Sequence, residues 1–215
     1  MSSDTEVTTE TKPAETKPAE TKPAETKPAE TKPAAKPAAK PAAKPAAKPA
    51  ELPAFEKSIS DKIVEKFGDK IEVEFVKENR VGIKVNRDDI HDVAEFIRDG
   101  LNYDHVESVS GVDYPQDKEI EVVYHIGSYS DSSLAKQLLV LATRAQREEN
   151  PIPGKDATKL PTLRDIFYSV EFLEREVFEM FGVYFTGHPD NRRLLLPEDW
   201  ADLPPLRKDF AIKGR

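Results

Sequence analysis

The residues of this chain that could do chemistry are concentrated in one segment, EREVFEMFGVYFTGHPDNRRLLL. The segment begins with an acid-rich stretch at helical spacing and continues, after a glycine, as a basic arm that a proline interrupts. Its candidate site residues are Glu174, Arg175, Glu176, Glu179, Gly182, His188, Arg192 and Arg193. So many charges in one place fit either an active site or a docking interface.

Acid–base catalysis is the first chemistry that the segment suggests. Two carboxylates can act as acid and base when their surroundings push their pKa values apart. Glu176 and Glu179 are three positions apart on one helical edge, which allows such a pair. However, no G-x-S-x-G elbow and no other nucleophile with an adjacent base accompanies them. We therefore favour ion-paired structural or interface residues and expect no catalytic residue.

Metal and cofactor sites have little support in the sequence. The chain has no cysteine, which excludes disulfides and any zinc or iron–sulfur site held by its own thiolates. No histidine pair at i, i+4 and no H-E-x-x-H motif occurs. The histidines are His91, His105, His125 and His188. Neither G-x-G-x-x-G nor G-x-x-x-x-G-K-[ST] is present, so we expect the chain to bind no cofactor.

The acid-rich stretch is predicted to form a helix from Val170 to Phe181, which Ser169 caps and Gly182 ends. The apolar stripe of this helix would be Leu173, Val177, Met180 and Phe181. The charged residues outside the stripe would be Glu174, Arg175 and Glu179. Glu176 falls at the edge of the stripe, so the pattern predicts that its carboxylate is partly buried.

A buried carboxylate needs a cationic or hydrogen-bonding partner. For Glu176, the candidates nearby in the sequence are Arg175, His188, Arg192 and Arg193. The sequence does not choose among them.

Residues 187–215 form an arm with several prolines and with neither helical nor strand periodicity. Its apolar side chains cannot be covered by local packing, so they must lie on the sheet of this domain or on another chain. They are Leu194, Leu195, Leu196, Trp200, Leu203, Leu206 and Phe210. We favour another chain.

The elements that must position this segment lie between residues 54 and 150. Apolar spacing predicts helices over 55–67, ended by Gly68, and from Asp88, as the cap, to Leu101. Strands are predicted over 71–76 and 81–85, joined as a hairpin, and over 106–112 and 120–126, with Gly111 among the residues marking the break. Residues 134–145 fit either a helix or a buried strand. These elements predict an α+β fold, a small and mainly antiparallel sheet with helices on one face.

The first part of the chain is of a different kind. Residues 11–30 repeat TKPAE four times, and KPAA repeats follow. Proline at every fourth or fifth position prevents a helix, and no large apolar side chain is present, so we expect a disordered tail. Its lysines could contact nucleic acid or anionic lipid, but a solubilising linker is the favoured interpretation.

Charge and hydropathy argue against a nucleic-acid-binding, a membrane-spanning and a secreted protein. Residues 1–51 hold nine lysines and eight acidic residues, which leaves 23 basic and 32 acidic residues, a formal net charge of −9, for the rest. That acidity argues against a fold that binds nucleic acid. No apolar run approaches the roughly 20 residues of a membrane span, and no secretory signal is visible. We expect a cytoplasmic chain that associates with a membrane only through partners.

The segment from Glu174 to Leu195 resembles the signature of the thirty-kilodalton subunit of respiratory complex I, an NADH-quinone oxidoreductase, and of related oxidoreductases. The order Glu-Arg-Glu, an acid, two apolar residues, a histidine, a basic residue and two aliphatic residues is matched without a gap. Further on, PLRKDF, which contains Arg207, Lys208 and Asp209, is similar to the terminal element of that family. The resemblance is strong over 160–210, and the repeat tail lies outside it.

This resemblance implies a peripheral-arm subunit without a cofactor, on the cytoplasmic side of the cell membrane. It would dock onto the forty-nine-kilodalton-like subunit near the quinone site and lie next to an iron–sulfur subunit. The signature charges would act as a docking network toward the partner and not as catalysts. Iron–sulfur clusters, flavin and quinone would belong to partner subunits, and residues 138–144 would form a strand. The electron donor stays open.

Composition, apolar spacing and the resemblance together predict a division of the chain. Residues 1–53 would be the tail, 54–150 the α+β domain, 151–186 a loop and the signature helix, and 187–215 a partner-docking arm. The alternatives are a protein that binds nucleic acid through its Lys/Pro tail, a small carboxylate enzyme, and a component of a related membrane-bound hydrogenase.

Overall fold

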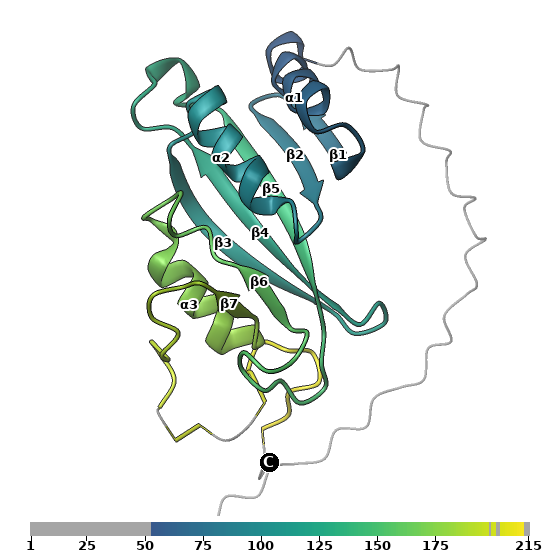
Figure 1. Ribbon diagram of the computed structural model, residues 1–215, viewed down its shortest axis with the longest axis vertical. Coiled ribbons are helices and arrows are strands. Elements are labelled where there is room, and N and C mark those ends of the chain that lie inside the picture. The colour runs from purple at the N-terminus through teal and green to yellow at the C-terminus, as the bar shows by residue number, and fades with distance from the viewer. Residues whose placement is uncertain (1–52, 198, 201–202, 213–215) are drawn as a thin grey trace, which may run out of the picture. The chain divides into compact units, whose positions relative to one another are not determined.

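The computed structural model describes residues 53–197, 199–200 and 203–212 (Figure 1). Predictions for residues 1–52, which include nearly the whole repeat tail, lie outside this part of the chain. The described residues belong to one compact unit, Ala47–Arg215.

The centre of this unit is a five-stranded sheet in the order β1-β2-β5-β4-β3. Its strands are β1 (Ile71–Lys77), β2 (Arg80–Val85), β3 (His105–Tyr114), β4 (Glu119–Gly127) and β5 (Leu138–Gln146). Within this sheet, β2 and β5 pair in parallel, and the other neighbours are antiparallel. The predicted hairpin and the mainly antiparallel sheet are therefore confirmed.

Strand β5 settles the ambiguity over residues 134–145. It lies between β2 and β4, and alternate side chains from Leu139 to Ala145 are buried on the core face. Val140 and Ala142 on the other face of β5 are buried as well. A strand that is buried on both faces is apolar almost throughout, which is why its periodicity resembled that of a helix. Gly111, which we expected at the break between β3 and β4, lies instead within β3.

The three α-helices of the described residues pack on one face of the sheet, as predicted (Figure 1). They are α1 (Ala54–Phe67), α2 (Ile90–Leu101) and α3 (Val170–Phe181). Short 3₁₀ turns occur at Gly68–Lys70 and Ser132–Leu134. The core lies between the helices and alternate residues of the strands, for example Ile120, Val122, Tyr124 and Ile126 of β4.

The predicted cap position is right for α3 and wrong for α2, and neither cap residue makes a side-chain hydrogen bond to its helix. Asp89, not Asp88, occupies the cap position of α2, where its side chain pairs with Lys70 at 2.6 Å instead of bonding to the helix. Ser169 does precede α3, but its hydroxyl accepts a hydrogen bond from the backbone N–H of Val106 at 3.0 Å. Ser169 thus ties the start of α3 to strand β3.

A second, two-stranded sheet flanks α3, where the sequence predicted loops. Strands β6 (Lys159–Pro161) and β7 (Tyr184–Thr186) pair in parallel, so α3 is the crossover between them. Each strand has only three residues, and Pro161 cannot donate a hydrogen bond from its nitrogen. Such strands exist only because α3 and the main sheet bring them together, which no local pattern reveals.

The close packing of α3 on β3 generates a first prediction. A Cβ atom on Gly111 would lie 2.5 Å from the ring of Phe181. We expect Gly111→Ala to destabilise the folded chain by about 1–3 kcal/mol, because the ring must leave its place. Urea unfolding of the purified chain measures this, with Ser110→Ala as the neighbouring control. An unchanged midpoint would mean that Phe181 can move at no cost.

Candidate functional site

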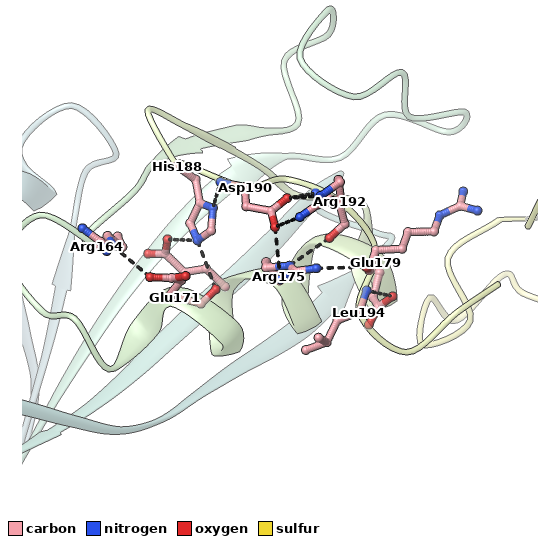
Figure 2. A network of polar contacts seen from close by, with 10 residues as sticks. Arg164, Glu171, Arg175, Glu179, His188, Asp190, Arg192 and Leu194 are labelled. Atoms are coloured by element: carbon pink, nitrogen blue, oxygen red, sulfur yellow. Dashed lines mark hydrogen bonds and ion pairs between the residues drawn. The ribbon is translucent and has the colours of Figure 1, made fainter. Parts of the chain in front are cut away.

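The arm after β7 lies along one side of α3, and its main contacts can be followed in Figure 2. His188 contacts the backbone carbonyl of Glu171. The backbone of residues 192–193 contacts the side chain of Arg175, and the backbone of residues 194–196 contacts the side chain of Glu179. The three helix residues are spaced by four, so they form one stripe of α3. One face of α3 therefore holds the arm, through two charged side chains and one backbone carbonyl.

Glu179 makes the strongest of these contacts. Its carboxylate, 4% exposed, accepts hydrogen bonds from the backbone N–H groups of Leu194, Leu195 and Leu196 at 2.8–3.0 Å. Charge-assisted hydrogen bonds of this kind are about twice as strong as neutral ones. With the backbone turned toward Glu179, the side chains of Leu194 and Leu195 remain 41% and 62% exposed.

Arg175 holds the middle of the arm. Its guanidinium donates to the carbonyl oxygens of Arg192 and Arg193 at 2.9 and 3.0 Å, and it lies 3.3 Å from the carboxylate of Asp190. Asp190 also accepts hydrogen bonds from the side chain and backbone of Arg192, which hold the pKa of its carboxyl well below the ordinary value. The sequence did not single out Asp190.

His188 fixes the beginning of the arm. Its Nδ1 accepts a hydrogen bond from the backbone N–H of Asp190 at 3.1 Å, so its hydrogen is on Nε2, which donates to the carbonyl oxygen of Glu171 at 3.0 Å. The side chain is fully buried, and Nε2 lies 4.0 Å from the carboxylate of Glu174. His188 thus links the beginning of the arm to the backbone of α3 and to the surroundings of Glu174.

Glu174 is fully buried beneath this arrangement. Its carboxylate accepts hydrogen bonds from the hydroxyl of Tyr124 at 3.1 Å, the hydroxyl of Thr162 at 2.5 Å and the backbone N–H of Leu163 at 2.9 Å. Burial raises the pKa of Glu174 from 4.5 to about 7, although the three hydrogen bonds act in the opposite direction. One side chain therefore connects α3, β4 and the segment after β6.

The prediction that Glu176 is partly buried is wrong. Glu176 is exposed, and the buried carboxylates are Glu174 and Glu179, which we placed outside the apolar stripe. The helix is rotated relative to the prediction, because donors from β4 and the loop after β6 satisfy Glu174 while the arm covers Glu179. These donors are remote in sequence, so the spacing of apolar residues could not reveal the rotation.

The structure does not form the carboxylate pair that the spacing of Glu176 and Glu179 allowed. Both oxygens of Glu179 accept backbone hydrogen bonds, whereas Glu176 faces solvent. Within the described ranges, no group of three or more His, Asp or Glu side chains is arranged as metal ligands. In the same ranges, no helix is both long and apolar enough to cross a membrane.

The last described segment, 203–212, packs on its own domain. Arg207 is buried and donates from Nε to the carbonyl oxygen of Phe181 at 2.6 Å and from Nη1 to that of Glu148. Burial and the nearby charge of Arg147 lower the pKa of Arg207. This part of the arm therefore closes the C-terminal end of α3, where we had favoured a contact with another chain.

A buried ion pair anchors the same segment. Arg147 contacts Asp113 at 2.6 Å and Asp209 at 2.8 Å, and the backbone N–H of Lys208 donates to Asp113 at 2.9 Å. The candidate residues Arg207, Lys208 and Asp209 thus gather here, apart from the contacts of Glu174, Glu179 and His188. Arg147 and Asp113 carried no sequence signal, because each lies in or beside a strand of otherwise ordinary composition.

The buried carboxyl of Glu174 generates a prediction about pH. A pKa raised from 4.5 to about 7 means that the folded chain holds a proton that the unfolded chain has lost. The contribution of Glu174 to the free energy of unfolding should be fully present below pH 4.5. It should fall by about 3 kcal/mol as pH rises through 7. In Glu174→Gln, which resembles the protonated form, thermal unfolding between pH 4.5 and 7.5 should lose this slope.

An exposed carboxyl provides the control for that experiment. Glu65→Gln on α1 should leave the pH dependence of the wild type unchanged. If Glu174→Gln kept the slope, other titrating groups would be responsible for it.

A third prediction concerns the contact between Glu179 and the arm. Glu179→Gln removes the charge that three backbone N–H groups share, so hydrogen exchange at Leu194, Leu195 and Leu196 should accelerate by at least about tenfold. Glu95→Gln, on the exposed face of α2, is the matched control. Unchanged exchange rates would show that the arm is held by its other contacts.

Comparison with known proteins agrees with the resemblance seen in the sequence. Residues 83–215 match the family described as respiratory-chain NADH dehydrogenase, 30 Kd subunit. The chain is 34% identical over 156 residues to the subunit designated C of the NADH-quinone oxidoreductase of Chlorobium phaeobacteroides, covering 71% of this chain and 87% of the relative. It is 36% identical over 131 residues to the subunit designated C of the F(420)H(2) dehydrogenase of Methanosarcina mazei, covering 61% and 75%.

A solved structure extends the likeness to the fold. A chain of the membrane-bound sulfane sulfur reductase, an archaeal respiratory membrane complex, superposes with a TM-score of 0.61 and 28% sequence identity. The superposition covers 73% of this chain and 86% of the other. The residues matched by the family include the whole of α3, its arm and the segment around Arg207. The chain belongs to the family of the thirty-kilodalton subunit of respiratory-chain NADH dehydrogenase, whose members are subunits of complex I-type oxidoreductases.

Proposed function

We propose that this chain is an assembly subunit of a complex I-type, proton-translocating oxidoreductase and carries no cofactor of its own. It would dock, through α3 and the arm, onto the forty-nine-kilodalton-like subunit near the quinone site. Electron transfer would belong to partner subunits, which hold the iron–sulfur clusters, flavin and quinone. The chain would lie peripherally, on the cytoplasmic side of the membrane.

The observation that carries this proposal is the way in which the arm is held. Glu179 and Arg175 of α3 bind backbone groups of the arm, Arg175 also pairs with Asp190, and His188 of the arm binds the backbone of α3. The arm therefore has a fixed course before any partner is present, while Leu194 and Leu195 remain exposed. Apolar side chains on a fixed backbone are what an interface needs, because little conformational entropy is lost on binding.

This arrangement changes the role of the signature charges. We expected them to contact the partner, but in the structure most of them are engaged within the chain. Their function in docking would be to hold the arm in place, and the leucines would make the contact. A charge reversal at Arg175 would then weaken docking indirectly, through loss of the shape of the arm.

The variety of the relatives supports an assembly role over recognition of a substrate. Their names refer to F(420)H(2), to NADH and quinone, and to sulfane sulfur, three different chemistries. A subunit shared by such complexes serves what they have in common, which is the framework around the electron path. The proposal accordingly leaves the electron donor of this complex open.

The proposal predicts that Leu195→Asp prevents assembly while the chain stays folded. Burying an unpaired carboxylate in an apolar interface costs several kcal/mol, enough to reduce the bound fraction by at least about a hundredfold. The measurement is co-purification of the other subunits with the tagged full-length chain from its native membranes.

Val64→Asp is the matched control, because Val64 is similarly exposed but lies on α1. It should co-purify like the wild type, and thermal unfolding should show that both variants fold. A Leu195→Asp chain that still brought down its partners in full would contradict docking through the arm.

A further inference from the structure

Strand β3 is an edge of the five-stranded sheet, and no strand lies on its other side within the described residues (Figure 1). It is ten residues long. The N–H of Val106 is bonded to Ser169, and the segment at Lys208 reaches Asp113. Between these two points, the backbone of residues 107–112 makes no hydrogen bond in the described structure except to β4. One edge of β3 is thus open over about six residues.

The composition of this edge is unusual for one that remains exposed. Natural edge strands are blunted by charges, proline or short length, because an open edge pairs with other chains. The opposite edge, β1, follows this rule with the exposed Glu72 and Glu74. In β3, by contrast, residues 108–112 are Ser, Val, Ser, Gly and Val. The bulge of β3 lies before this stretch, between Val106 and Ser108.

A groove accompanies the open edge. It has a volume of about 240 Å³ and lies between Val109 and Gly111 of β3 and Met180 of α3, with the half-exposed Leu206 at one end. Glu176 also lines it, exposed and without an ion pair in the described part of the chain. An apolar groove with one exposed carboxylate beside a free strand edge is a site for an extended peptide.

We propose that the open edge of β3 receives an extended segment of another subunit, which adds a sixth strand to the sheet. Its backbone would bond to residues 107–112, an apolar side chain would enter the groove near Gly111, and a lysine or arginine would pair with Glu176. This inference rests on the proposed function, since it assumes that the chain is part of a larger complex.

Two other occupants fit less well. The tail of the chain itself has proline at every fourth or fifth position from residue 13 to residue 49, and proline cannot donate to a strand ladder. A second copy paired edge to edge would bring a second Glu107 and a second Glu176 to the interface, and like charges at an interface cost several kcal/mol. A basic segment of a different protein is complementary in charge.

Photo-crosslinking in the assembled complex tests the inference. The photo-reactive amino acid p-benzoyl-L-phenylalanine is placed at the exposed Ser110, and at Glu74 of β1 as the control edge. We expect an adduct from Ser110 with one other subunit, mapped by mass spectrometry to an extended segment that contains lysine or arginine. Position 74 should give no such adduct.

A charge reversal then tests the role of Glu176. Glu176→Lys should lower the adduct yield by at least about tenfold, since like charges repel across the site. Glu65→Lys, the same change on the exposed face of α1, should leave the yield unchanged. An adduct with a second copy of this chain, with a helical segment, or with no polypeptide at all would overturn the inference.

Co-purification separates this inference from the function on which it rests. If the wild-type chain brings down no other subunit, the proposed function fails. If it does so but Ser110 forms no adduct with another subunit, only the sixth strand is refuted.

Discussion

The fold around α3 depends on one buried carboxyl group, that of Glu174. A carboxyl without solvent is costly unless its oxygens are satisfied, and here the donors come from β4 and from the loop after β6, with His188 of the arm nearby. Satisfying Glu174 therefore requires the main sheet, the crossover helix and the loop after β6 to be in place together. The group brings together parts of the chain that have no apolar pattern in common.

The same principle extends along the helix. Carboxylate and guanidinium groups of α3 bind backbone amides and carbonyls, which gives an arm without regular secondary structure a defined course. Backbone groups that a helix or strand would satisfy internally are satisfied here by side chains of a neighbouring element. The charged side chains of α3 thus make contacts within the subunit. The exposed apolar side chains of the arm remain available to neighbouring subunits.

Sequence reasoning was accurate wherever the local pattern decides the structure. The bounds of α1 and α3, the first hairpin and the one-sided packing of helices all follow from apolar spacing and from glycines such as Gly68 and Gly182. It failed where a contact with residues remote in the sequence determines the structure. Glu174 and Glu176 exchanged their expected environments, Ser169 and Asp89 bonded elsewhere than in a cap, and β6 and β7 exist only through pairing with each other. The sequence located the segment that forms the candidate site, but it did not show that the carboxylates of Glu174 and Glu179 are buried.

The central place of β5 has a kinetic consequence. Strand β5 pairs in parallel with β2, from which α2, β3 and β4 separate it along the chain, and it fills the space between two hairpins. Until it does so, both β2 and β4 present an unpaired edge. Closing so long a loop is slow, and intermediates with open edges aggregate. We therefore expect the subunit to fold slowly. It should depend on chaperones more than a protein of this size whose strands pair locally.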